Sequence, residues 1–459
     1  VADAAVTAVS FEEFKGEAMA MGEKTPIAVS NAAAASRMAI GEALTNLVSV
    51  DVNLDRIILS ANWMGACGVK GQDAALYDGV SAASSFCQEL GVSIPVGKDS
   101  LSMKTSWKDQ AGEDKTVVSP VSLVVSAAAP VYDIRNNLLP MFAESVRDSS
   151  LLLIDLGHGK DRLGGSVYSQ VTQRFDSVTP DMEDPKELKK FLELIRSLSA
   201  KGAILAYHDR SDGGLAAALC EMMFASHVGV EIVADALVSK DRTLNQALFN
   251  EELGAVIQVA RGRAAEVERD FEAAGMGWSL KYLGNLTQDD HLNIYLEGKC
   301  VLSEDRVDLQ KAWNEVSWQI ARMRDNPECA DSEYELISDK HNGGLVLTMG
   351  FDPEENLAAP FINTGVRPKV AILREQGVNS QNEMASAFLQ AGFDAVDVHM
   401  TDLLEGRAKL ADFVGLAACG GFSYGDVLGA GGGWAKTILH NAKLQSSFRC
   451  FFETPTTFT

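Results

Sequence analysis

The chain has 459 residues, a formal net charge of −23 at pH 7 and a hydrophobic content of 46%, which predicts about three globular domains. A chain this acidic, with a pI near 4.7, lacks the basic surface that nucleic acid or an anionic membrane requires, so neither is expected as a partner. The seven cysteines form no Cys-x-x-Cys pair, and the longest apolar run, 117–131, is too short to span a bilayer. These features predict a cytoplasmic protein with reduced thiols.

Residues 1–143 alternate strand and helix patterns and predict a first domain of α/β or α+β type. Apolar residues recur at helical spacing in some segments and form short, continuous runs in others. Helices are expected at 31–47 and 73–90, and strands at 4–9, 56–60, 92–96, 101–107 and 117–128.

The expected helix 31–47 carries one polar pair that is suited to a metal ion. Glu42 and Asn46 are four residues apart, so their side chains project from the same helix face. Carboxylate and amide oxygens are donors that Mg²⁺ accepts, usually together with substrate phosphates. A solvated face is the alternative interpretation, but the helix is otherwise apolar or small, which favours a site.

Residues 144–324 predict a second domain, which begins with a strand at 151–155 and a glycine-rich loop at 157–165. The loop lacks the Gly-x-Gly-x-x-Gly spacing, so phosphate binding and a flexible loop remain alternatives. Helices are expected at 185–201, 214–225 and 264–274.

A strand-to-helix turn at 207–214 is a second candidate site. Asp212 can cap the helix that follows, and two glycines leave the amides at the helix N-terminus open to a phosphate. A plain capped turn explains the same residues. We expect His208, beside Asp209, to be a hydrogen-bonded structural histidine.

Residues 325–366 contain several proline and glycine turns and predict a linker, and residues 367–459 predict a third domain. Within this domain a helix that ends at Gly392 lies between the first two strands. This βαβ pattern is typical of a doubly wound parallel sheet, which binds its ligands at the carboxyl ends of the strands. The strands are expected at 369–373, 395–398 and 413–419.

The last of these strands leads into a glycine-rich loop. Gly420 and Gly421 are oxyanion-loop candidates, because paired glycines let backbone N–H groups face an oxyanion. Cys419 ends the apolar strand and is expected to be buried and inert.

Several motifs, spread in order over the whole chain, resemble the phosphoribosylformylglycinamidine synthase family of large single-chain type. The resemblance implies two aminoimidazole-ribonucleotide-synthetase-like domains, followed by an incomplete flavodoxin-like class I glutamine amidotransferase domain. The motifs are GEALTN at 41–46, SANWM at 60–64, PVGKDS at 95–100, HDRSDGG at 208–214, LFNEELG at 248–254, REQGVN at 374–379 and CGGFSYGD at 419–426.

The resemblance also implies a ligase, in which ATP and glutamine convert formylglycinamide ribonucleotide to its amidine in purine biosynthesis. The second synthetase half, which this chain resembles, holds a magnesium ion and an ATP or ADP molecule in that family. The residues that the resemblance assigns to magnesium are Asp3, Glu42, Asn46 and Asp209, and those assigned to the nucleotide are Ala2 and Ser211.

By the same resemblance the chain is expected to be a fragment, with its partners in the missing N-terminal and C-terminal parts of the same polypeptide. The nucleophilic cysteine and its histidine and glutamate are expected beyond residue 459, so the fragment alone is expected to be inactive. Gly432 and Thr454 depart from the family pattern, which carries glutamate and arginine there. A noncatalytic nucleotide-binding scaffold, or another synthetase-like enzyme fused to an amidotransferase-like domain, remains an alternative.

Overall fold

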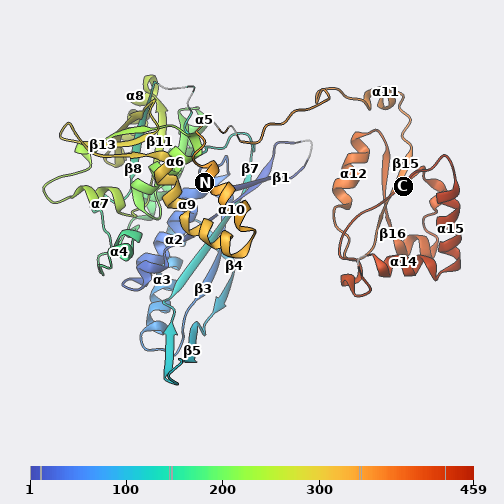
Figure 1. Cartoon of the computed structure of the whole chain (residues 1–459), viewed down its shortest axis with the longest axis horizontal. Coiled ribbons are helices and arrows are strands. Elements are labelled where there is room, and N and C mark those ends of the chain that lie inside the picture. Colours follow the sequence, from blue (N-terminus) through green and yellow to red (C-terminus); the bar gives the residue numbers. More distant parts are fainter. Residues whose placement is uncertain are drawn as a thin grey trace. The chain divides into compact units, whose positions relative to one another are not determined.

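The computed structural model describes residues 2–10, 13–143, 145, 148–340, 342, 344–429 and 431–459. The chain divides into two units, Val1–Asn342 and Gly343–Thr459, which we call unit 1 and unit 2 (Figure 1). Among the described residues, none of the helices is both long enough and apolar enough to cross a membrane.

The first sheet of unit 1 is mixed, because β3 and β4 run parallel while its other neighbouring strands are antiparallel. In β2, Ala18 and Ala20 are buried and alternate with the exposed Met19 and Met21, so one face of the sheet belongs to the core. In spatial order the strands are β1 (Ala5–Ala8), β2 (Gly16–Glu23), β7 (Ser122–Val131), β3 (Ile58–Met64) and β4 (Ser93–Ser100).

Helix α2 (Ala32–Leu47) packs between this sheet and the next one. Asn31 caps the helix by accepting a hydrogen bond from the Ala34 N–H at 3.0 Å. Nearly every residue of α2 is buried, and the Tyr207 hydroxyl of the second sheet donates to the Thr45 carbonyl at 2.6 Å. The helix therefore carries Glu42 and Asn46 into the junction between the two sheets.

The second sheet of unit 1 holds the strand that ends at Asp209, and two neighbouring strands of this sheet, Ser149–Asp155 and Gly254–Ala260, are buried along nearly their whole length. In spatial order the strands are β14 (Lys299–Asp305), β13 (His291–Leu296), β10 (Val230–Val233), β12 (Leu280–Leu286), β8 (Ser149–Asp155), β11 (Gly254–Ala260) and β9 (Ile204–Asp209).

Further helices cover the two sheets, and a hairpin of β5 and β6 extends away from the rest of unit 1 (Figure 1). The remaining elements of unit 1 are α1 (Thr25–Ala28), α3 (Gln72–Leu90), β5 (Lys104–Lys108), β6 (Asp114–Val118), α4 (Val167–Val171), α5 (Pro185–Ala200), α6 (Gly214–Ser226), α7 (Leu244–Phe249), α8 (Ala264–Ala273), α9 (Arg306–Arg324) and α10 (Pro327–Leu336).

Helix α10 lies inside the span 325–366 that the sequence indicates as a linker. It packs on α9, where the rings of Trp318 and Tyr334 stack with centroids 4.2 Å apart. The Tyr334 hydroxyl also donates to the Lys311 carbonyl at 3.1 Å. The first part of that span is therefore folded, as the second helix of a hairpin in unit 1.

Unit 2 contains a parallel sheet with β15 at its centre, which brings the loops at the carboxyl ends of β15 and β17 together. Its own core includes Leu373, Val398 and Phe448. The strands in spatial order are β16 (Asp394–His399), β15 (Lys369–Arg374) and β17 (Gly415–Ala418), and the helices are α11 (Ala359–Ile362), α12 (Gln381–Gln390), α13 (Met400–Glu405), α14 (Gly432–Leu439) and α15 (Ala442–Glu453).

The structure corrects one predicted strand. The run 117–128 was expected to be continuous, but it belongs to two strands, β6 and β7, which pair in different sheets. Pro120 lies between them and has no N–H group to donate to a strand ladder. The chain therefore leaves the β5–β6 hairpin at this proline and enters the first sheet.

Candidate functional site

A cluster of Asp3, His208 and Asp209 forms where β9 ends beside the segment that leads into β1. The His208 imidazole Nδ1 lies 2.8 Å from Asp3 Oδ1, and the Asp209 N–H donates to the same oxygen at 3.1 Å. One ligand atom from each of the three residues lies within 4.8 Å of the others. The fold thus brings together two carboxylates that are 206 positions apart in the sequence.

Two oxygens of this cluster are buried without a hydrogen-bond partner among the residues that the structure describes. They are Asp3 Oδ2 and Asp209 Oδ2. Burial, and then the negative charge of Asp3, raise the pKa of Asp209 well above its usual value, and Glu42 adds to this effect. Unpaired carboxylate oxygens in an acidic, buried position fit a hard cation such as Mg²⁺, which takes oxygen ligands.

Glu42 and Asn46, both on α2, are engaged by protein groups. Glu42 Oε2 accepts a hydrogen bond from the Glu23 N–H at 2.7 Å, and Glu42 Oε1 is 3.4 Å from Lys24 Nζ. The Asn46 side-chain amide donates to the Met21 carbonyl at 3.1 Å. Both side chains therefore face the end of β2, and the charge of Glu42 reaches Asp209.

His208 is held from both ring nitrogens, as expected for a structural histidine. Its Nε2 lies 2.8 Å from Glu221 Oε2, and the other Glu221 oxygen accepts from the Trp313 indole N–H at 3.2 Å. Burial alone would lower the pKa of His208, but hydrogen bonds to Asp3 and Glu221 raise it to about 10. His208 is therefore a positioning cation that fixes Asp3.

Lys24 is part of the site and was not singled out from the sequence. Its side chain is only 2% exposed, and Nζ lies 2.6 Å from Asp212 Oδ1 and 3.9 Å from Glu251 Oε2. Burial would lower the pKa of Lys24, but the charges of Glu42, Glu251 and Asp212 hold it above its usual value. No local pattern marks this lysine, because its partner Asp212 is 188 positions away.

The turn after β9 differs from its prediction. Helix α6 begins after Gly213 with no side-chain cap, and Asp212 pairs with Lys24 instead. The Gly213 N–H donates to Glu251 at 2.9 Å, and the Gly214 N–H donates to the Ser211 carbonyl. Two amides at this helix N-terminus, those of Gly213 and Gly214, are therefore occupied by protein acceptors rather than open to a phosphate.

The two residues assigned to the nucleotide flank the acidic cluster. Ala2 is exposed and precedes Asp3 directly. Ser211 is half-buried, two residues after Asp209, and its hydroxyl oxygen accepts from the Asp212 N–H at 2.6 Å. Both positions are within the same two segments that supply the carboxylates.

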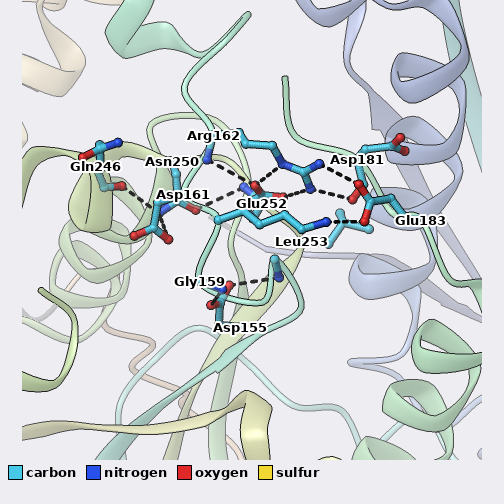
Figure 2. A network of polar contacts seen from close by, with 12 residues as sticks. Asp155, Gly159, Asp161, Arg162, Asp181, Glu183, Gln246, Asn250, Glu252 and Leu253 are labelled. Carbon is cyan, nitrogen blue, oxygen red and sulfur yellow. Dashed lines mark hydrogen bonds and ion pairs between the residues drawn. The ribbon is translucent and has the colours of Figure 1, made fainter. Parts of the chain in front are cut away.

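A buried polar network fixes the segments around the site (Figure 2). Arg162 donates to Glu252 at 2.7 and 2.9 Å and also to the Asp181 carbonyl at 2.9 Å. The Asn250 amide donates to Asp161 at 3.2 Å, and Asp155 accepts from the Gly159 N–H at 3.1 Å. The glycine-rich loop 157–165 is therefore held by hydrogen bonds to carboxylates.

Asp155 links this network to the strand that carries Asp209. The Arg210 guanidinium Nη2 lies 2.5 Å from Asp155 Oδ1, and both side chains are almost completely buried. Although burial raises the pKa of Asp155, the Arg210 charge and hydrogen bond hold it below its usual value. The buried Asp155–Arg210 ion pair thus connects the loop 157–165 and the motif 248–254 to the end of the strand that carries Asp209.

In unit 2 the two glycine-containing loops pair with each other. The Asn379 N–H donates to the Gly420 carbonyl at 3.1 Å, and the Phe422 N–H donates to the Gly377 carbonyl at 2.8 Å. Gly421 has φ +147°, and a Cβ there would lie 2.4 Å from the Gly377 carbonyl oxygen. Among the hydrogen bonds of the described residues, neither the Gly420 nor the Gly421 N–H is a donor.

Cys419 lies directly before this loop and is 5% exposed. Burial raises the pKa of its thiol, which disfavours the nucleophilic thiolate. The expectation of a buried cysteine is confirmed.

Three domain models match the chain in succession. They are the FGAR-AT PurM_N-like domain over residues 1–130, the AIR synthase related protein C-terminal domain over residues 149–297, and the CobB/CobQ-like glutamine amidotransferase domain over residues 367–459.

Solved structures from Thermotoga maritima have a similar fold. PurL complexed with FGAR matches with 11% identity and a TM-score of 0.51, over 67% of this chain and 47% of that chain. Phosphoribosylformylglycinamidine synthase II matches with 11% identity and a TM-score of 0.51, over 66% and 45% respectively. PurL complexed with ADP matches with 10% identity and a TM-score of 0.51, over 86% and 53%. The chain therefore spans about half the length of these structures.

The fold and the domain order define a synthetase-type pair of domains joined to a glutamine amidotransferase-like domain, which confirms the expected fold class. The chain belongs to the phosphoribosylformylglycinamidine synthase family.

Proposed function

We propose that the chain is part of the ligase that converts formylglycinamide ribonucleotide to formylglycinamidine ribonucleotide, and that unit 1 holds a magnesium-bound ATP or ADP. Family membership supports the ligase assignment, and related PurL structures contain FGAR and ADP. The observation that carries the nucleotide site is the pair of buried, unpartnered oxygens of Asp3 and Asp209.

The residues of unit 1 would hold magnesium in two stages. Asp3 Oδ2 and Asp209 Oδ2 are available as they stand, because neither has a hydrogen-bond partner within the described part of the chain. Glu42 and Asn46 would join by exchanging their contacts with Lys24 and Met21. Bound magnesium would screen the charge of the phosphates. Ala2 and Ser211, in the same two segments, are the proposed nucleotide contacts.

In the whole enzyme the proposed reaction uses glutamine as the nitrogen source. Glutamine hydrolysis releases ammonia, and ATP phosphorylates the substrate amide oxygen to give an iminophosphate and ADP. Ammonia then attacks that carbon and phosphate leaves with the oxygen. Unit 2 would contribute Gly420 and Gly421 to the hydrolysis step, since their N–H groups donate no hydrogen bond among the described residues.

A noncatalytic nucleotide scaffold is the second candidate function. Two cations of the site, Lys24 and His208, favour this function. They already pair with carboxylates of the site, an arrangement that suits a nucleotide that stays bound. Nucleotide that stays bound through purification without turnover would support the scaffold. Ligase activity after addition of the remaining parts of a family enzyme would support the catalytic role.

The proposed boundaries of the parts remain 1–143 and 144–324 for the synthetase-like domains, 325–366 for the connecting segment, whose first part is the helix α10 packed on unit 1, and 367–459 for the amidotransferase-like domain. A cytoplasmic location is also proposed, and it is supported by seven cysteines that are all unpaired.

The amidotransferase part of the proposal has a direct test. The 459-residue chain is expected to release no glutamate from glutamine, because Cys419 is buried and its pKa is raised. Glutamate release by the purified chain, lost in Cys419→Ser, would show instead that this thiol is a nucleophile.

A further inference from the structure

Lys24 occupies an unusual position for a lysine, since its ammonium group is buried among three carboxylates from different segments. Glu42 comes from α2, Asp212 from the turn after β9, and Glu251 from the motif before β11. The Lys24 side chain is 2% exposed. The carboxylates hold the ammonium group of Lys24 in one position, where it can also pair with an anion that binds beside it.

The three carboxylates are not equivalent. Glu42 is held by the Glu23 N–H, and Glu251 accepts from the N–H groups of Val167 and Gly213 at 2.8 and 2.9 Å. Both side chains are less than a tenth exposed. They are built into the protein and cannot leave without breaking other hydrogen bonds.

Asp212 differs on every point. Its side chain is 66% exposed although its partner is buried, and the contact with Lys24 is the shortest of the three at 2.6 Å. Its carboxylate has no other hydrogen bond or ion pair among the described residues. It lies next to Ser211, a proposed nucleotide contact, and three residues after Asp209, whose Oδ2 is unpartnered.

We propose that Lys24 is a phosphate-positioning residue of the nucleotide site and that Asp212 occupies its ammonium group until the terminal phosphate of the nucleotide replaces it. This inference rests on the proposed nucleotide function. The exchange swaps one oxyanion for another at the same nitrogen, so no bond is made or broken beyond the ion pair. Lys24 then favours a nucleoside diphosphate or triphosphate over the monophosphate, because the proposed contact is with the terminal phosphate that the monophosphate lacks.

The inference predicts effects of opposite sign for the two partners. Asp212→Asn removes the competing anion, so magnesium-ADP should bind about two- to fivefold more tightly. Lys24→Met removes a charged donor, so binding should weaken by at least about tenfold, and the preference for ADP over AMP should fall. A purely structural ion pair predicts that both substitutions weaken binding equally for ADP and AMP.

The test is calorimetric titration of the whole chain with magnesium-ADP and magnesium-AMP, for wild type, Asp212→Asn, Lys24→Met and Lys24→Arg. Asp78→Asn is the matched control, because Asp78 is exposed on α3, has the same charge, and is remote from Lys24 in the sequence. Lys24→Arg keeps the charge and should retain the ADP preference. If Lys24→Met does not fold, two other measurements test the inference. They are the ratio of the affinities of Lys24→Arg for ADP and AMP, and the direction in which Asp212→Asn changes the affinity for magnesium-ADP.

Two outcomes would overturn the inference while leaving the nucleotide function intact. They are an Asp212→Asn protein that binds magnesium-ADP no more tightly than Asp78→Asn, and an ADP preference that survives Lys24→Met. Failure of the wild-type chain to bind magnesium-ADP at all would be a separate result, since it contradicts the proposed function itself.

Discussion

Asp209→Asn is expected to change the stability of unit 1 in opposite directions without and with magnesium-ADP. Asp209 is 5% exposed, and its pKa is raised well above the usual value, first by burial and then by Asp3. A carboxyl group of this kind loses stability as pH rises from its unfolded pKa through its folded pKa. At neutral pH without metal, the substitution removes this cost, so the melting temperature should rise.

With bound nucleotide, the wild type is expected to melt at a higher temperature than Asp209→Asn, the reverse of the order without it. A ligand that binds only the folded state, at a hundredfold excess over its dissociation constant, stabilises by about 2.7 kcal/mol. Unit 1 ends at Asn342, and about 2.1 cal/mol/K of unfolding entropy per residue then converts this to about 4 °C. The wild type should gain this increment, whereas Asp209→Asn, which lacks one proposed ligand, should gain little.

Thermal scans followed by circular dichroism measure both effects, first with a chelator and then with magnesium-ADP. Asp78→Asn, which changes the same charge on exposed α3, is the control and should follow the wild type in both conditions. The reasoning would be refuted if Asp209→Asn melted at a lower temperature than the wild type in chelator, or if it kept the full increase in melting temperature from magnesium-ADP.

Three further substitutions test other parts of the structure. Asp155→Asn leaves the buried Arg210 without its counter-ion and should cost about 3–5 kcal/mol in urea unfolding; an unchanged midpoint would contradict the buried pair. Gly22→Ala places a Cβ 2.1 Å from the Ala39 carbonyl oxygen, so β2 and α2 must separate, at about 1–3 kcal/mol by the same assay. His208 has a raised pKa of about 10, so its contribution to stability is complete below about pH 6.5 and lost towards pH 10. His208→Gln should flatten the fall in wild-type melting temperature over that range, and an identical pH profile would count against the interaction.

Elements with strong local signals could be predicted from the sequence. Helix α2 begins at its Asn31 cap and ends where its apolar pattern ends, and β8 and β15 coincide with short apolar runs. The strand β2 was not predicted, because Gly16–Glu23 contains glycine, alanine and glutamate, which are depleted in strands. Its alternating burial arises from packing against α2, which no local pattern reveals.

The candidate site shows the same division between local and long-range information. The residues Asp3, Glu42, Asn46 and Asp209 were assigned by resemblance, and the fold brings Asp3 and Asp209 into contact across two sheets. The role of Lys24 could not be predicted from the sequence, because its three carboxylate partners come together only in the folded protein. The roles of all these residues as ligands remain predictions.

The central claim is that Asp3 and Asp209 hold a divalent cation together with a nucleotide. The most direct measurement is the anomalous diffraction of crystals of the chain grown with manganese-ADP, since Mn²⁺ accepts the oxygen ligands that suit magnesium. The account predicts an anomalous peak within bonding distance of Asp3 Oδ2 and Asp209 Oδ2, with the nucleotide phosphates on its other side. Bound ADP with its manganese elsewhere, or these two oxygens joined by a protein hydrogen bond, would contradict it.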